Sequence, residues 1–181
     1  MNRTCFLTGA LGCIGAWAVK HVLDRGEEPV VFDLGDDLRR IKDLVGPEEL
    51  ERVRLIQGDV TDTDAVVAAV RDSGADRIVH LAGLQVPFCK ADPVLGARVN
   101  VVGTLNLFQA AAECDIVRLV YASSAAVYGP DDLGPDGAAP DEDTPLNPTT
   151  HYGVYKRANE GNAKIFFTDS EISSVGIRPL T

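Results

Sequence analysis

Short runs of apolar and β-branched residues alternate along the chain with longer segments of helical periodicity. The runs predict buried strands at residues 5–8, 29–32, 53–57, 77–81, 117–123 and 173–178. The periodic segments predict helices at residues 12–25, 36–51 (broken near 46–47), 61–70, 92–113 and 150–168. Strands that alternate with helices are typical of a parallel sheet covered on both faces. We therefore predict an α/β fold with a doubly wound parallel sheet and a ligand crevice at the carboxyl ends of the first and fourth strands.

The helix expected at residues 12–25 places its apolar side chains on one face, which we expect to pack on the sheet. These side chains are Ile14, Trp17, Ala18, Val22 and Leu23. A different pattern occupies residues 129–148, which hold five of the ten prolines and six acidic residues. Because few apolar anchors remain there, we expect a solvated surface loop, of a length that is often functional.

Charge and composition narrow the class of protein. The formal net charge is −10, so no surplus of Lys and Arg is present to neutralise phosphates, and a nucleic-acid partner is not expected. No stretch approaches the roughly 20 apolar residues that span a membrane, and no membrane association is expected.

The cysteines show no metal-binding pattern. None of the four belongs to a CxxC pair or shares zinc-ligand spacing with a histidine, so no metal site is expected. They are Cys5, Cys13, Cys89 and Cys114. We interpret them as free thiols of a cytoplasmic protein.

A glycine-rich turn follows the first strand. Gly9, Gly12 and Gly15 are spaced as GxxGxxG, with Cys13 and Ile14 between the last two, and the turn opens a helix. The first glycine permits the tight turn, the second lets the backbone approach a pyrophosphate, and the third lets the helix pack closely on the strand. By itself such spacing is as often a structural turn, but its place between a strand and a helix favours a dinucleotide site.

An acidic residue ends the second strand. Asp33 lies 18 residues beyond the third glycine, where a carboxylate can accept hydrogen bonds from both adenosine ribose hydroxyls. A 2′-phosphate there would meet Asp33, Asp36 and Asp37, and each like-charge contact near a surface costs about 1–4 kcal/mol. NAD is therefore favoured over NADP. Arg39 and Arg40 keep NADP open, because an arginine at this point could pair with the phosphate.

Candidate chemistry lies further along the chain. Tyr152 and Lys156 lie one turn apart on one face of a predicted helix. A free tyrosine, with a pKa near 10, is a poor base at neutral pH, but a nearby ammonium and a cationic nicotinamide would lower that pKa. Ser124, at the end of the fifth strand, could hold a substrate oxygen beside the phenol. An isolated YxxxK is usually coincidental; here it follows the glycine turn, the acid and the serine-rich strand end in order.

With these motifs the chain resembles the extended short-chain dehydrogenases/reductases, the NAD-dependent epimerase/dehydratase group that includes nucleotide-sugar 4-epimerases. The matching segments are TGALGCIG at 8–15, GDV at 58–60, HLAGL at 80–84, NVVGT at 100–104, SSAAVYG at 123–129 and HYGVYK at 151–156. The resemblance covers essentially the whole chain, and it implies a Rossmann fold that binds NAD. It is specific for the superfamily and poorly specific for the substrate.

The resemblance also implies roles for further residues. The cofactor contacts would be Asp59 and Val60 at the adenine, Leu81, Ala82 and Gly83 along the path to the nicotinamide, and Asn100 as a brace beside it. Tyr152 would be the acid/base, Lys156 would hold the nicotinamide ribose, and Ser124 would orient the substrate. Two plainer interpretations stay open: strand-end packing for residues 81–83, and a local helix hydrogen bond for Asn100.

The implied function is an NAD-dependent oxidoreductase or epimerase that transfers hydride on a sugar nucleotide or a related small hydroxy compound. An amino-alcohol (threonine-type) dehydrogenase is the alternative enzyme, because residues 148–156 share the sequence pattern of such enzymes. A non-catalytic NAD-binding fragment is the other alternative. Family members continue into a substrate-binding part, so we expect residues 1–181 to be one NAD-binding domain whose C-terminal substrate domain is largely missing.

The resemblance further implies a homodimer in which the helices at 92–113 and 150–168 form a four-helix bundle with their twins. These helices carry more apolar positions than one inward stripe requires. The positions are Val94, Val101, Leu105, Phe108, Ala158, Ile165 and Phe166. A monomer with a wide core face is the alternative.

Overall fold

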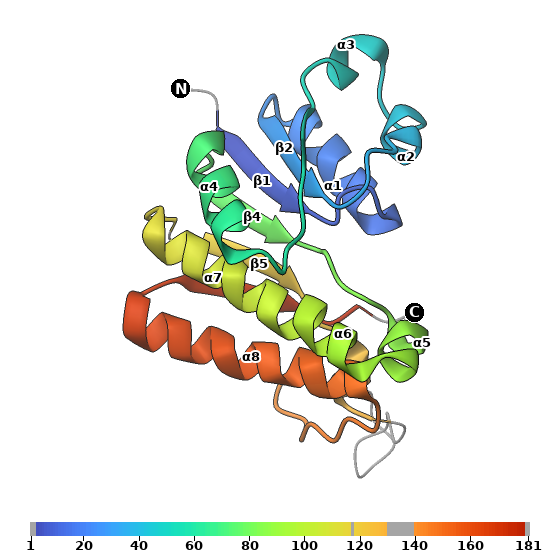
Figure 1. Cartoon of the computed structure of the whole chain (residues 1–181), viewed down its shortest axis with the longest axis vertical. Coiled ribbons are helices and arrows are strands. Elements are labelled where there is room, and N and C mark those ends of the chain that lie inside the picture. Colours follow the sequence, from blue (N-terminus) through green and yellow to red (C-terminus); the bar gives the residue numbers. More distant parts are fainter. Residues whose placement is uncertain (1–2, 117, 130–139, 180–181) are drawn as a thin grey trace.

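Six parallel strands form one sheet in the order β3-β2-β1-β4-β5-β6 (Figure 1). The computed structural model describes residues 3–116, 118–129 and 140–179. The strands are β1 (Thr4–Thr8), β2 (Glu28–Asp33), β3 (Arg54–Gln57), β4 (Arg77–His80), β5 (Arg118–Ala122) and β6 (Ser173–Ile177). Because the strand order reverses between β1 and β4, the sheet is doubly wound. The predicted α/β class and Rossmann fold are confirmed.

Helices connect the successive strands. They are α1 (Cys13–Asp24), α2 (Arg39–Lys42), α3 (Pro47–Leu50), α4 (Thr63–Ser73), α5 (Val86–Ala91), α6 (Pro93–Ala97), α7 (Gly103–Glu113) and α8 (His151–Ser170). A π-helical turn, Arg98–Val102, joins α6 to α7, and a 3-10 turn, Ala125–Val127, follows β5. Of the expected surface loop at 129–148, residues 130–139 lie outside the described part of the chain, as does residue 117 of the predicted fifth strand.

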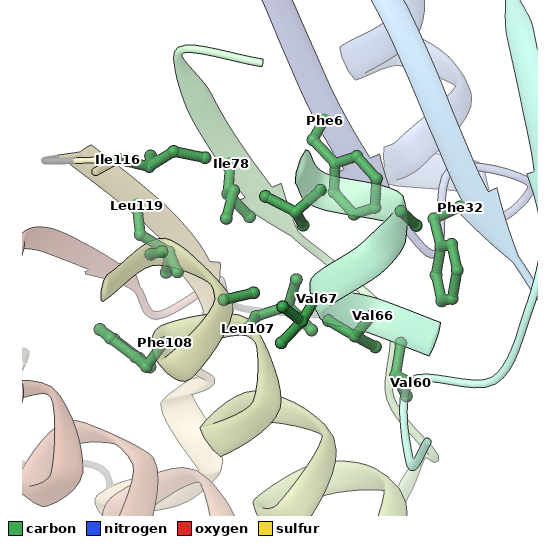
Figure 2. Close-up of a cluster of buried hydrophobic side chains, with 14 of the residues drawn as sticks. Phe6, Phe32, Val60, Val66, Val67, Ile78, Leu107, Phe108, Ile116 and Leu119 are labelled. Carbon is green, nitrogen blue, oxygen red and sulfur yellow. The ribbon is translucent and has the colours of Figure 1, made fainter. Parts of the chain in front are cut away.

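The strand side chains alternate between two cores, one on each face of the sheet. Phe6 and Phe32 point toward α4 and α7, where they join Leu107 and its neighbours (Figure 2). Leu7 points to the opposite face and packs with Val19 of α1. The division follows directly from the period-two alternation of side chains along β1 and β2.

The predicted inward face of α1 was partly wrong. Ile14 and Trp17 are 61% and 49% exposed, whereas Ala16 and Val19, which the prediction left out, are buried. The helix presents the stripe through Gly15, Ala16, Val19 and Leu23 to the sheet. At Gly15 its first turn approaches the backbone of Gly9 and Ala10 too closely for any side chain. Val22 and Leu23 are buried as predicted.

The long helix predicted at 92–113 is interrupted by the π-helical turn, which holds Asn100. The apolar surplus on this helix is also smaller than expected. Phe108 is fully buried and stacks on Phe166 of α8, with ring centroids 4.9 Å apart, so it belongs to the core. The helix predicted at 36–51 is reduced to α2 and α3, of four residues each.

Candidate functional site

The glycine turn after β1 lies in close contact with the backbone that follows β4. Gly9 has a φ of +66°, and a Cβ atom built there would lie 2.5 Å from the Ala82 nitrogen. A Cβ on Gly15 would lie 2.4 Å from both the Ala10 Cα and the Gly9 carbonyl oxygen. Any side chain at either position would force the turn away from its neighbours, so the geometry accounts for both glycines.

The amino-terminal turn of α1 is open. Gly12 caps the helix without a side-chain hydrogen bond, and the first turn contains no acidic residue. Gly12, Cys13 and Ile14 are all exposed. Backbone amides at such a helix terminus point outward and favour an anion. Ile14 is exposed in this first turn and does not pack in the core.

Asp33 lies at the end of β2 and is held against the glycine turn. Its carboxylate accepts hydrogen bonds from the amides of Leu11 (3.2 Å) and Gly35 (3.4 Å). Arg40 donates to the Leu11 carbonyl oxygen at 3.1 Å, which places its guanidinium beside the same turn. Arg39 is instead paired with Asp37. Of the two arginines that kept NADP open, Arg40 is therefore the one near Asp33.

The residues expected at the adenine lie after β3. Asp59 is exposed and accepts a hydrogen bond from the Thr61 amide at 2.8 Å, which closes the turn. Val60 is buried in the core of Figure 2. A Cβ on Gly103 would lie 2.9 Å from a Val60 methyl carbon, so Val60 packs tightly on the start of α7.

Beyond β4, the chain passes close to both Asn100 and Lys156. Leu81 and Ala82 are half-buried and Gly83 is exposed. A Cβ on Gly83 would lie 2.6 Å from the Asn100 Oδ1 and 3.6 Å from the Lys156 Nζ. Residues 81–83 thus form a wall after β4, and at Gly83 this wall meets α8.

Asn100 does more than make a local helix bond. It accepts a hydrogen bond from the Leu84 amide, and its Nδ2 donates to the carbonyl oxygens of Leu84 and Gly96 and to the Cys89 Sγ. Only the bond to Gly96 lies within its own helical segment. The others fix the loop after β4, and a role of Asn100 beside the cofactor stays a prediction.

Ser124, Tyr152 and Lys156 come together at the carboxyl end of β5. The Lys156 Nζ donates to the Ala122 carbonyl oxygen at 2.7 Å and lies 5.5 Å from the centroid of the Tyr152 ring. Burial lowers the pKa of Lys156 to about 8. Burial also raises the pKa of Tyr152, and a hydrogen bond with Ser124 opposes that rise without cancelling it. Desolvation is thus the largest effect on the Tyr152 pKa. The lowering expected from the ammonium together with a cationic nicotinamide beside the ring stays a prediction.

Two groups near the site escaped sequence reasoning. The fully buried Cys89 thiol accepts from Asn100, and burial raises its pKa. On α8, Glu160 accepts two hydrogen bonds from Arg178 (2.7 and 2.8 Å) and one from Ser123 (2.6 Å). The spacing of Glu160, four residues after Lys156 on the same helix face, was the available signal for this cluster.

A hollow of about 1030 Å³ lies elsewhere, between α8 and β6. Its lining includes Glu160, Arg178 and Tyr128 but none of Ser124, Tyr152 and Lys156. Within residues 3–116, 118–129 and 140–179, no group of three His, Cys, Asp or Glu side chains is placed to hold a metal ion. The helices of this same part include none with the length and apolarity needed to cross a membrane.

A doubly wound parallel sheet with a glycine turn between its first strand and helix is the arrangement of dinucleotide-binding α/β domains. Comparison of the sequence with family profiles narrows this class: the NAD dependent epimerase/dehydratase family matches residues 5–181, and the chain belongs to that family. The family is one of NAD-dependent oxidoreductase chemistry, in agreement with the cofactor expected from Asp33.

Individual relatives support the same family and differ in substrate. UDP-glucose 4-epimerase 2 of Arabidopsis thaliana is 33% identical over 162 residues, which cover 86% of this chain and 45% of the relative. Human 3 beta-hydroxysteroid dehydrogenase type 7 is 41% identical over 144 residues, covering 77% and 37%. The crystal structure of a Thermus thermophilus UDP-glucose 4-epimerase in complex with NAD superposes with a TM-score of 0.83 at 29% identity, covering 97% and 54%. The chain thus spans about half the length of these proteins, or less.

Proposed function

We propose that residues 1–181 form the NAD-binding domain of an oxidoreductase that moves hydride between a substrate carbon and the nicotinamide. The observation that carries this proposal is the convergence of Ser124, Tyr152 and Lys156 beside Gly83, where the Lys156 ammonium lies 3.6 Å from a Cβ position on the wall after β4. Proton-transfer groups and the cofactor crevice thereby share one edge of the sheet.

An extended dinucleotide would lie along the carboxyl ends of the strands. Gly9 and Gly15 let the turn pack closely on Ala82 and Ala10, and the first turn of α1 presents exposed backbone where a pyrophosphate would lie. Asp33 would receive the ribose hydroxyls, and the wall from Leu81 to Gly83 would line the path to the nicotinamide. When bound, NAD supplies the hydride acceptor. Asp59 and Val60 complete the proposed adenine end.

Lys156 has two functions in the proposed mechanism. One of its three N–H groups is bound to the Ala122 carbonyl oxygen, which leaves two for the hydroxyls of the nicotinamide ribose. With a pKa of about 8, the amine is mostly protonated at neutral pH and can stabilise a phenolate.

Tyr152 moves the proton of the substrate hydroxyl. Because burial raises its pKa, the phenol of the chain alone is protonated and suited to donate to a carbonyl. Acting as a base on an alcohol requires added positive charge near the ring, which the oxidised cofactor would provide. Ser124 would hold the substrate oxygen during either direction of transfer.

The proposed substrate is a sugar nucleotide or a related hydroxy compound, with 4-epimerisation as the leading reaction. Simple oxidation of a hydroxysteroid is the second candidate. It is favoured by the 41% identity to the human hydroxysteroid dehydrogenase and by the exposed Val86 and Phe88 of α5, two apolar side chains on the helix that carries Cys89 beside the site. A threonine-type amino-alcohol dehydrogenase is the third candidate, because residues 148–156 share the sequence pattern of these enzymes.

The test is a substrate panel of a UDP-hexose, a 3β-hydroxysteroid and threonine, incubated with NAD and the protein as its gene encodes it. Epimerisation changes the sugar without net NADH, whereas either dehydrogenase accumulates NADH. Tyr152→Phe should lower turnover about 10²–10⁴-fold with NAD affinity nearly unchanged. Tyr155→Phe is the matched control, because its hydroxyl binds the Pro93 carbonyl oxygen away from the triad. Near-normal turnover in Tyr152→Phe would refute its assignment as the acid/base.

We also propose a cytoplasmic homodimer formed through α6, α7 and α8. These helices lie side by side in Figure 1, and they leave Val94, Val154, Ile165 and Phe167 well exposed. A two-fold interface would bury the same patch on both copies. All four cysteines are free, in keeping with a reducing compartment.

A further inference from the structure

A line of buried polar side chains runs beneath the crevice from β1 to α7. Thr8 and His80 are register partners on the adjacent strands β1 and β4. The Thr8 Oγ1 lies 2.7 Å from the His80 Nδ1, and the His80 Nε2 lies 3.0 Å from the Oγ1 of Thr104 on α7. All three residues are at least 97% buried.

The number of protons available to these side chains fixes which group donates in each hydrogen bond of this line. The Thr104 hydroxyl has one proton, and it donates that proton to the Asn100 carbonyl oxygen at 2.7 Å. Thr104 can therefore only accept from His80, so the imidazole must carry a proton on Nε2. The His80 Nδ1 is then an acceptor, the Thr8 hydroxyl donates to it, and the Thr8 oxygen accepts from the Ala82 amide at 3.3 Å.

Both ends of the line reach the walls of the crevice. At one end, the Thr8 hydroxyl holds the Ala82 amide, the same nitrogen that a Cβ on Gly9 would clash with. At the other end, Asn159 of α8 donates to the Thr104 Oγ1 (3.1 Å) and to the Asn100 carbonyl oxygen (2.8 Å). Asn159 lies three residues after Lys156 on the same helix.

We propose that His80 is a positioning residue which, as a neutral imidazole with its proton on Nε2, sets the spacing between the glycine turn, the wall at Ala82 and the helix that carries Lys156. This inference rests on the proposed NAD function, since the spacing matters only if a cofactor occupies the crevice. Burial, and next the charge of Lys156, lower the pKa of His80 to about 3, so the ring stays neutral at working pH. Because the tautomer is fixed, the position of the Thr104 hydroxyl determines the orientation of the His80 ring and, through it, that of the Thr8 hydroxyl.

The matched variants are Thr104→Val and Thr104→Ser. Valine keeps the shape of threonine and removes the acceptor for the Nε2 proton, whereas serine keeps the hydroxyl and loses one methyl group. We expect Thr104→Val to raise the Kd for NAD about tenfold or more, equivalent to about 1.4 kcal/mol, while Thr104→Ser stays close to the unmodified protein. If Thr104 acted only through packing, Thr104→Ser would raise the Kd for NAD more than Thr104→Val. That result would overturn the proposal.

A second measurement needs neither an activity assay nor NAD. Nitrogen-15 NMR of the histidine side chains should show His80 neutral with its proton on Nε2 from pH 5 to pH 8. In Thr104→Val, the proton should shift at least partly to Nδ1, and the Ala82 amide resonance should move with it. An imidazolium, or an Nδ1–H form in the unmodified protein, would overturn the inference regardless of cofactor binding. Absence of NAD binding with the expected tautomer intact would instead refute the proposed function, and the positioning role with it.

Discussion

The ion pair between Glu160 and Arg178 offers the sharpest test of how α8 is fixed to the sheet. Arg178 holds Glu160 with two hydrogen bonds, and the Arg178 and Glu160 side chains are only 19% and 14% exposed. Glu160→Gln keeps the size of the side chain but removes its charge and turns one acceptor into a donor that faces the guanidinium. Breaking a buried pair on one side costs about 3–5 kcal/mol, and the remaining exposure reduces this to an expected loss of about 2–3 kcal/mol in the free energy of unfolding.

Urea unfolding followed by circular dichroism measures this loss as a lower midpoint with an unchanged slope. Glu113→Gln is the control, because the pair of Glu113 with Arg71 is long (3.6 Å) and exposed, and its loss should change stability by less than about 1 kcal/mol. Equal stability in the Glu160 and Glu113 variants would refute the reasoning that the Glu160 pair anchors α8.

The same carboxylate predicts a pH dependence. Burial raises the pKa of Glu160, but hydrogen bonds from Arg178 and Ser123 outweigh that effect, so its pKa in the folded protein lies below the ordinary range. A carboxyl whose pKa is depressed by folding contributes stability above its unfolded pKa, near 4.3, and this contribution is lost as the pH falls through the folded pKa. The difference between the unmodified protein and Glu160→Gln should therefore be largest from about pH 6 upward and shrink below about pH 4.

Three further predictions concern the cofactor and assembly. Asp33→Ala should weaken NAD binding and narrow its advantage over NADP in calorimetric titrations, because the variant lacks the carboxylate proposed to accept the ribose hydroxyls and to repel a 2′-phosphate; equal or tighter NADP binding by the unmodified chain would contradict the assignment. Gly9→Ala should abolish measurable NAD binding, because the added Cβ lies 2.5 Å from the Ala82 nitrogen; unchanged binding would show that the turn can shift freely. Light scattering should give a dimer at tens of micromolar and a monomer for Ile165→Glu; a monomeric unmodified protein would count against the proposed interface.

Much of the sheet and the glycine turn after its first strand could be predicted because their signals are local. The apolar runs of β1, β2 and β4 and the glycine spacing at 9–15 each sit within a few residues of sequence, and strand order follows from the handedness of crossovers. The register of α1 was harder: Ile14 and Trp17 fit a helical stripe as well as Ala16 and Val19 do. The choice between them depends on how closely the helix approaches β1, which is a tertiary property.

The contacts between buried polar side chains from distant parts of the chain could not be predicted. His80 and Thr104 are 24 residues apart, and Glu160 and Ser123 are 37 apart, so only the folded chain brings them into contact. The burial of the Tyr152 ring could not be predicted for a related reason. The sequence indicated the neighbouring ammonium, but not how far the ring would be removed from water, and desolvation is the largest effect on the pKa of Tyr152.

The ammonium of Lys156 is anchored on the main-chain carbonyl oxygen of Ala122. Every residue type has that oxygen, so a substitution at position 122 alters only the side chain and leaves the anchor in place. The position of the cation is thus tied to the path of β5 and not to the identity of its residues. Side chains around the strand end can accordingly be exchanged to suit a different substrate while the distance between the cation and the phenol is preserved.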